Sequence, residues 1–179
     1  QNQSFYGGGG GRRAPGGRAG AAASSQGGSG PQNSNGEGPS DSVLLNREIL
    51  AQPTAEEIAA FAEKRAAEFD EVHYVTAIHR IAKSGGVRAR DVAGVGRLVE
   101  HLRGSIPEMK PRHIANTAWA FARLVYRDAP SWSSISQAAK GSTAQFRPQE
   151  LASTTWSFAA MRILDVPLCD AIAQAAIAS

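Results

Sequence analysis

Two groups of polar side chains carry most of the chemistry that this sequence offers. They lie 37 residues apart, and each follows a proline. The first group is Arg112, His113, Asn116, Thr117 and Arg123, and the second is Gln149, Ser153 and Thr154. Amide and hydroxyl groups can hydrogen-bond to the edges of nucleic-acid bases, while guanidinium groups stack on bases or contact phosphates. Side chains of these types indicate a binding surface.

Residues suited to catalysis or metal binding are scattered along the chain. His73 and His79 are six positions apart, a spacing that does not place two ligands on one helical face. No P-loop, zinc-protease, hydrolase-elbow or calcium-loop motif is present, and the glycines at 7–11 lack the flanking strand and helix of a phosphate loop. Cys169 is the lone cysteine, which argues against a disulfide framework and favours a buried, inert thiol. We therefore expect no catalysis, cofactor, metal or small-molecule substrate in this segment.

A sequence repeat defines the elements that must position the polar groups. Residues 110–124 read KPRHIANTAWAFARL, and residues 147–161 read RPQELASTTWSFAAM. The repeat continues downstream, because DAP at 128–130 recurs as DVP at 165–167. A third, degenerate copy lies in DEVHYVTAIHRIAK at 70–83, where His79 takes the place of Trp119 at an offset of 40. A fixed period of roughly 20–50 residues is typical of stacked repeat units.

Apolar residues at helical spacing predict helices and no strands. Thr54, as the N-cap, and Glu57 form a capping box for a helix over 55–69, and further helices are expected over 70–84 and 89–103. Prolines 111, 148 and 167 open later helices, of which the first reaches about residue 126, and another follows Pro130 and stops at Gly141. Trp119 and Trp156 are expected on the buried faces, with Ala115, Ala118 and Ala122 in the first unit and Ala152, Thr155 and Ala159 in the second. The polar groups would then face outward.

These elements predict an all-α fold: an α-α superhelix of about three helical hairpins, each 37–40 residues long. The Gly-, Ser- and Arg-rich residues 1–42 are expected to be a disordered linker, and residues 43–179 to form the helical-repeat domain. We expect this domain to be truncated at its C-terminal end. No apolar run is long enough for a membrane span.

The charge of the chain does not by itself indicate nucleic-acid binding. The formal net charge is +3, divided into +2 for residues 1–40, −1 for residues 41–106 and +2 for residues 107–179. The repeats are therefore nearly neutral. Arginines 12, 13 and 18 lie among glycines, but three arginines without a strict RGG triplet favour a plain linker over an RNA-binding tail.

The pattern P-x-x-L/I-A-x-T-x-W-A/S-F-A, which both full copies carry, resembles the octotricopeptide-type repeats of organelle RNA-processing factors. With FDEVHYVTAIHRIAK ahead of the two copies, residues 69–179 are most similar to the RNA-editing substrate-binding complex 6 protein domain family of kinetoplastids and alveolates. The first unit departs from the pattern, because it has His79 instead of tryptophan and no opening proline.

This resemblance implies a module that binds single-stranded RNA in organellar RNA processing or editing, in the mitochondrion more than in the plastid. Protein subunits of an RNA-processing complex would be further partners.

Three other interpretations stay open at this point. The same fold can be a protein–protein scaffold without RNA contact, which the near-neutral charge favours. A solvent-facing helix surface is also polar and variable without any ligand. A catalytic domain beyond Ser179 is a third possibility.

Overall fold

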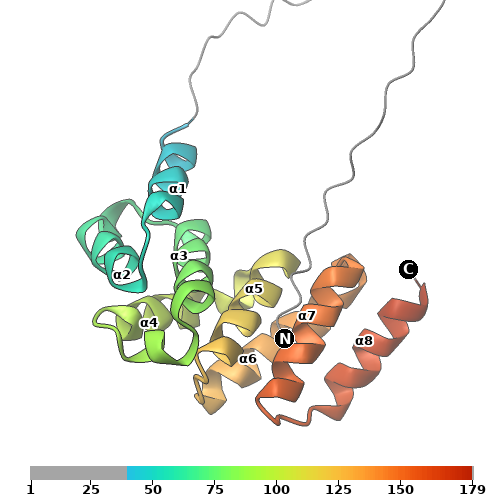
Figure 1. Ribbon diagram of the computed structural model, residues 1–179. Coiled ribbons are helices and arrows are strands. Elements are labelled where there is room, and N and C mark those ends of the chain that lie inside the picture. Colours follow the sequence, from blue (N-terminus) through green and yellow to red (C-terminus); the bar gives the residue numbers. More distant parts are fainter. Residues whose placement is uncertain (1–39, 179) are drawn as a thin grey trace, which may run out of the picture. The chain divides into compact units, whose positions relative to one another are not determined.

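The computed structural model describes residues 40–178, which form helices and short 3-10 turns and contain no β-strand (Figure 1). The predicted all-α class is therefore confirmed for this part of the chain. The predicted linker lies outside the described residues, apart from residues 40–42, of which Asp41 and Ser42 already belong to the first helix. In chain order the α-helices are α1 (Asp41–Ala51), α2 (Ala55–Lys64), α3 (Glu71–Gly85), α4 (Val95–Ser105), α5 (Pro111–Arg123), α6 (Ala129–Ser142), α7 (Pro148–Ala160) and α8 (Val166–Ala178).

Most helices begin where the sequence places a capping group. The Thr54 hydroxyl accepts a hydrogen bond from the Glu57 backbone amide at 3.2 Å, which is the N-cap half of the predicted capping box. Asp70 caps α3 by accepting from the His73 amide. Pro111 and Pro148 occupy the first positions of α5 and α7, where a missing N–H costs nothing.

The region between α3 and α5 differs from the prediction. A helix was expected over 89–103, but residues Gly86–Asp91 form the 3-10 helix η2 and α4 begins only at Val95. Gly94 precedes α4 with φ +89°, a left-handed conformation that separates the two segments. Helix α3 ends at Gly85, one residue beyond the predicted end at 84, and its C-cap Gly86 has φ +54°.

The elements around α5 recur 37 positions later. The 3-10 helices η3 (Ile106–Glu108) and η4 (Thr143–Gln145) precede α5 and α7, and each of these two helices has 13 residues. Both end in the same motif: Tyr126 N–H donates to the Phe121 carbonyl at 2.8 Å, and Ile163 N–H donates to the Phe158 carbonyl at 2.9 Å. The sequence repeat is thus matched by equivalent local structure.

The helices pack in two layers. Helices α3, α5 and α7 lie side by side in that order (Figure 1). Helix α6 packs on α5 and α8 on α7, and α6 also contacts α8. Helices α1 and α2 cover α3. The core between these helices contains Phe121, Ile114 and Ile135, whose side chains are fully buried.

Polar contacts join successive units at equivalent positions. Arg103 of α4 contacts the Asp128 carboxylate at 2.7 Å, and 37 residues later Lys140 of α6 lies 3.7 Å from the Asp165 carboxylate. Hydrogen bonds from Ser131 and Ser136, together with these cations, hold the pKa values of Asp128 and Asp165 below their usual range. Each aspartate also caps the helix that follows it.

Candidate nucleic-acid interface on helices α3, α5 and α7

The exposed side of α5 is a single narrow stripe. Arg112 and Arg123 are exposed, while Asn116 and Trp119 are half-buried between them. The four positions are separated by four, three and four residues, which places them on one line along a helix. The predicted positions Arg112, Asn116 and Arg123 therefore do reach the surface together.

Thr117 and Thr154 were predicted to face outward, and this prediction is wrong because both are fully buried. Helix α5 has α3 on one side, α7 on the other and α6 behind it, so its solvent-facing arc is narrower than that of a helix with one neighbour. The Thr117 hydroxyl donates to the Met109 sulfur at 3.6 Å. Thr154 has no hydrogen-bond partner among the described residues, since its unit has Phe146 where the first unit has Met109.

His113 of α5 also contacts a neighbouring helix, α3, and is not free on the surface. Its ring is half-buried, and Nδ1 lies 2.5 Å from a carboxylate oxygen of Glu71 on α3. This pair joins α3 to α5, so His113 holds the two helices together at the edge of the stripe. Its counterpart in the second unit is Glu150, whose carboxylate accepts from the Arg147 backbone amide.

The two repeat tryptophans are less buried than predicted. Trp119 is half-buried, and 47% of Trp156 is exposed. Ala152, Thr155 and Ala159, also predicted to be buried, are exposed as well. They belong to the side of α7 on which no described helix packs other than α8. Cys169 is exposed, so the prediction of a buried thiol is wrong for the same reason.

With these corrections, α3, α5 and α7 present equivalent stripes. We call the twelve positions the ladder face. No member is buried, and the middle of each stripe holds a ring. The residues are Val72, Thr76, His79 and Lys83 on α3; Arg112, Asn116, Trp119 and Arg123 on α5; and Gln149, Ser153, Trp156 and Ala160 on α7.

The rings of the α3 and α5 stripes contact each other. The His79 and Trp119 ring centroids are 4.7 Å apart with their planes at 37°. The Arg123 guanidinium lies 5.8 Å from the Trp119 ring centroid, within the range of a cation–π contact. This guanidinium lies beside Gly86, where a side chain would come within 3.5 Å of Arg123 Nη2.

The charges and rings of the ladder face favour a negatively charged ligand that has planar groups able to stack. None of its positions is acidic, whereas Lys83, Arg112 and Arg123 are basic. Burial lowers the pKa of His79 below its usual range, and the charges of Lys83, Arg80 and Arg112 lower it further. His79 is therefore a neutral ring at neutral pH, which can stack without binding a proton.

The sequence alone pointed to three of the four positions on α5 but missed the ring between them. The spacing of positions 112, 116, 119 and 123 could have indicated Trp119, because four positions at these intervals lie along one face of a helix. The tryptophans were instead predicted to be buried, because the residues around both of them are rich in alanine.

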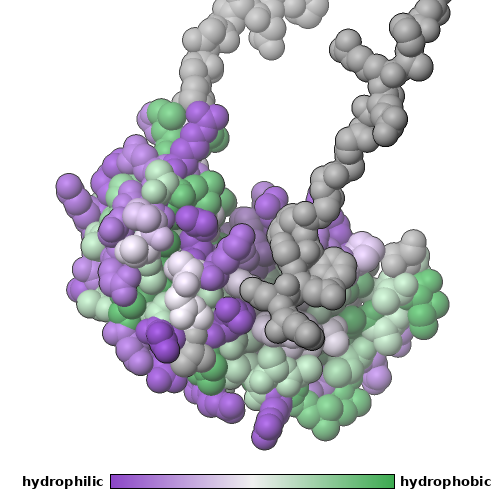
Figure 2. Space-filling model, viewed as in Figure 1, coloured by the Kyte–Doolittle hydropathy of each residue, from purple (hydrophilic) through white to green (hydrophobic). Residues whose placement is uncertain are grey.

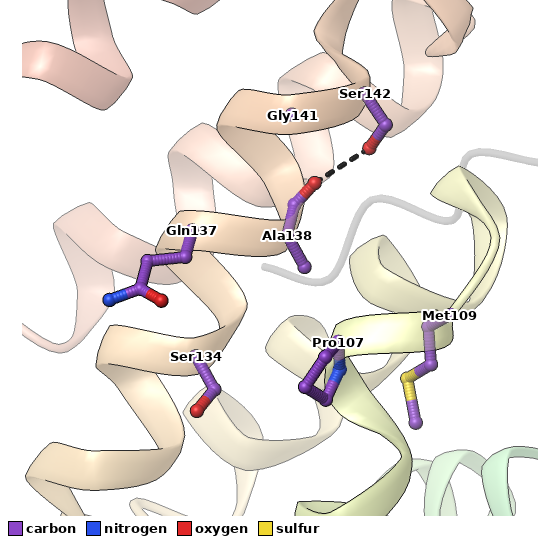
Figure 3. Close-up of a pocket in the computed structure, with 7 residues that line it drawn as sticks. All are labelled: Pro107, Met109, Ser134, Gln137, Ala138, Gly141 and Ser142. Carbon is purple, nitrogen blue, oxygen red and sulfur yellow. Dashed lines mark hydrogen bonds between the residues drawn. The ribbon is translucent and has the colours of Figure 1, made fainter.

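Other hollows offer less chemistry. A cavity of about 380 Å³ lies between η3 and α6, where Ser134, Gln137 and Met109 line it and the Ser142 hydroxyl is already bonded to the Ala138 carbonyl (Figure 3). No charged side chain lines this cavity. Within residues 40–178, His, Cys, Asp and Glu side chains form no cluster that could hold a metal ion.

None of the described helices combines the length and hydropathy needed to cross a bilayer.

Comparison of the chain with known protein families, curated proteins and solved structures gives no match.

Proposed function

We propose that the ladder face binds single-stranded RNA, and that the helical hairpins form an α-α superhelix that presents it. The observation that carries the proposal is the row of rings at equivalent positions of α3, α5 and α7, with basic side chains beside it and no acidic one within it. Stacking on aromatic rings inside a positively charged groove is the general way in which proteins hold unpaired bases.

Each part of the ladder face has a role in this proposal. Trp119, Trp156 and the neutral His79 provide surfaces on which bases stack. Asn116 and Ser153, one turn away from the tryptophans, offer amide and hydroxyl groups to base edges. Arg112 and Arg123 lie near opposite ends of α5 and contact phosphates, which positions the strand without reading its sequence.

The equivalence of successive units supports a superhelix with one reading position per unit. Polar residues on the ladder face differ between units, as Arg112 and Gln149 do, while the core positions Phe121 and Phe158 repeat. A modular reader of RNA has this combination of constant core and variable surface.

The cellular setting rests on the resemblance to organelle RNA-processing repeats. On that basis we propose work in organellar RNA processing or editing, in the mitochondrion rather than the plastid, with protein subunits of such a complex as additional partners. No catalysis is assigned to these residues.

A protein–protein scaffold is the second candidate, and the apolar surface on α7 and α8 favours it. The two functions are separated by salt dependence, because RNA contacts release counterions and peptide contacts on an apolar surface do not.

We expect filter binding of single-stranded homopolymer RNA to show saturable affinity that falls with salt. If Lys83, Arg112 and Arg123 each contact one phosphate of single-stranded RNA, the logarithm of the binding constant should fall with the logarithm of the salt concentration with a slope of about −2. Arg112→Ala and Arg123→Ala should each reduce the magnitude of this slope by about 0.7 and weaken binding to all four homopolymers alike.

Arg47→Ala is the matched control, because Arg47 is an exposed arginine on α1 and is not one of the twelve ladder positions. It should leave both affinity and slope unchanged. Equal effects of all three substitutions would mean that charge anywhere on the molecule suffices, and absence of saturable binding would favour the scaffold.

A further inference from the structure

A second surface consists of five positions that occur in both repeat units. These positions are buried in the first unit and more exposed in the second. In the first unit Ala115, Ala118, Ala122, Trp132 and Ile135 are all buried, with exposed fractions of 6% or less. Their counterparts 37 residues later are less buried: Ala152, Thr155, Ala159 and Cys169 are exposed, and Ile172 is half-buried. We call these five counterparts the docking face.

The difference follows from what each unit has packed on it. Helix α7 packs on α5 and α8 on α6, and Trp132 of α6 contacts Phe158 of α7 edge-on, with 5.0 Å between the ring centroids. No described helix occupies the corresponding place on α7 and α8. Figure 2 shows hydrophobic surface over α8 and over the turn before it, where Leu164 and Ile177 are 82% and 88% exposed.

The docking face is shaped as a groove. A cavity of about 520 Å³ lies between α7 and α8, lined by Ala152, Thr155 and Ile172 of the docking face and by Leu151. Trp156 of the ladder face also lines this cavity, so it borders both surfaces. Small side chains at positions 152 and 159 allow another helix to approach closely, as the alanines of α5 allow α7 to do. None of the five residues of the docking face carries a charge.

We infer that the docking face binds a helical hairpin of the same repeat pattern, whose first helix packs on α7 as α7 packs on α5. The interface between the two units of this chain is the reason for this choice, because it shows what covers an equivalent surface. A second copy is a poorer occupant, since the corresponding side of α3 is already covered by α1 and α2.

The groups at the junction specify one property of the partner. At the two preceding junctions a basic residue meets an aspartate: Arg103 with Asp128, and Lys140 with Asp165. The basic residues Arg103 and Lys140 are 37 positions apart. The residue 37 positions after Lys140 is Ile177, which cannot pair with a carboxylate. The bound hairpin therefore needs no carboxylate where α8 has Asp165 as its N-cap.

The test uses Cys169, the one cysteine of the chain, as the reporter. The full chain is extended after Ser179 by a short flexible linker and a copy of residues 143–178 that carries Asp165→Ser and Cys169→Ser. Covalent attachment gives the appended hairpin a high effective concentration. If it docks, alkylation of Cys169 should slow by at least about tenfold, because the counterpart Trp132 is only 3% exposed. The melting temperature should rise by roughly 10 °C.

Control variants distinguish docking from a general effect of the extension. Ala152→Glu or Ala159→Glu on the docking face should restore rapid alkylation, whereas Ala67→Glu, at an exposed position of η1 (Ala66–Glu68), should not. Unchanged alkylation and melting temperature in the extended chain would overturn the inference. Protection of Cys169 in the unextended chain that increases with concentration, with a dimer in sedimentation, would make a second copy the occupant and overturn it equally.

Discussion

Trp156→Ala is expected to lower the affinity for single-stranded RNA by about 5- to 150-fold, which corresponds to the 1–3 kcal/mol that one base–aromatic stack contributes. The same substitution should reduce the free energy of unfolding by less than about 1 kcal/mol, because 47% of the residue is already in solvent. Affinity would be measured by fluorescence anisotropy of a labelled oligonucleotide and stability by urea unfolding.

Two variants separate stacking from simple loss of apolar surface. Trp156→Phe keeps a flat ring and should retain most of the affinity. Leu164→Ala removes an exposed apolar side chain from the turn after α7 and should have no effect on RNA binding. If Trp156→Ala binds RNA as the wild type does, α7 takes no part in the interface.

Phe121→Ala is expected to reduce the free energy of unfolding by about 3–5 kcal/mol. Phe121 is fully buried, its ring contacts that of Tyr126 with 5.1 Å between centroids, and α3, α7 and α6 surround its helix. Such a position cannot collapse around the cavity that alanine leaves, so the lost contacts are not recovered.

The equivalent substitution in the second unit provides the comparison. Phe158 is 5% exposed, and α7 has a neighbouring helix, α5, on only one side within its layer, whereas α5 lies between α3 and α7. Phe158→Ala should therefore be less costly than Phe121→Ala, with urea unfolding followed by circular dichroism as the measurement. A larger loss for Phe158 would mean that the second unit, and not the first, is the centre of the core.

The two units also show which features could be read from the sequence. Pro111 and Pro148 predicted the starts of α5 and α7, and Thr54 predicted the start of α2, because each acts through its own backbone or its nearest amides. The period of 37 predicted which positions are equivalent. These are local properties, so a single sequence reveals them.

The burial of a given residue depends on neighbours that no local pattern specifies. Thr117 and Asn116 are adjacent polar residues, yet Thr117 is fully buried and Asn116 reaches the surface. The difference arises because α5 lies between α3 and α7. Trp119 and Trp156 share one sequence context, and their different exposure follows from the units that pack around them.

Helices α1 and α4 illustrate a second limit of sequence patterns. Helix α1 buries only Leu45 and Ile49, so its apolar periodicity is too weak to indicate a helix. Helix α4 was expected from position 89 because its apolar spacing extends upstream of Gly94. The left-handed conformation of that glycine sets the start instead.

The most direct test of the proposed interface is a tryptophan-fluorescence titration with single-stranded RNA. The chain has three tryptophans: Trp119 and Trp156 on the ladder face, and Trp132, which is 3% exposed in the core. Stacked bases should quench the first two and leave the third unchanged. We therefore expect saturable partial quenching in the wild type, and none in the double variant W119F/W156F, which should still bind RNA when followed by anisotropy. Saturable binding without quenching in the wild type would contradict the account, because RNA would then occupy some surface other than the ladder face.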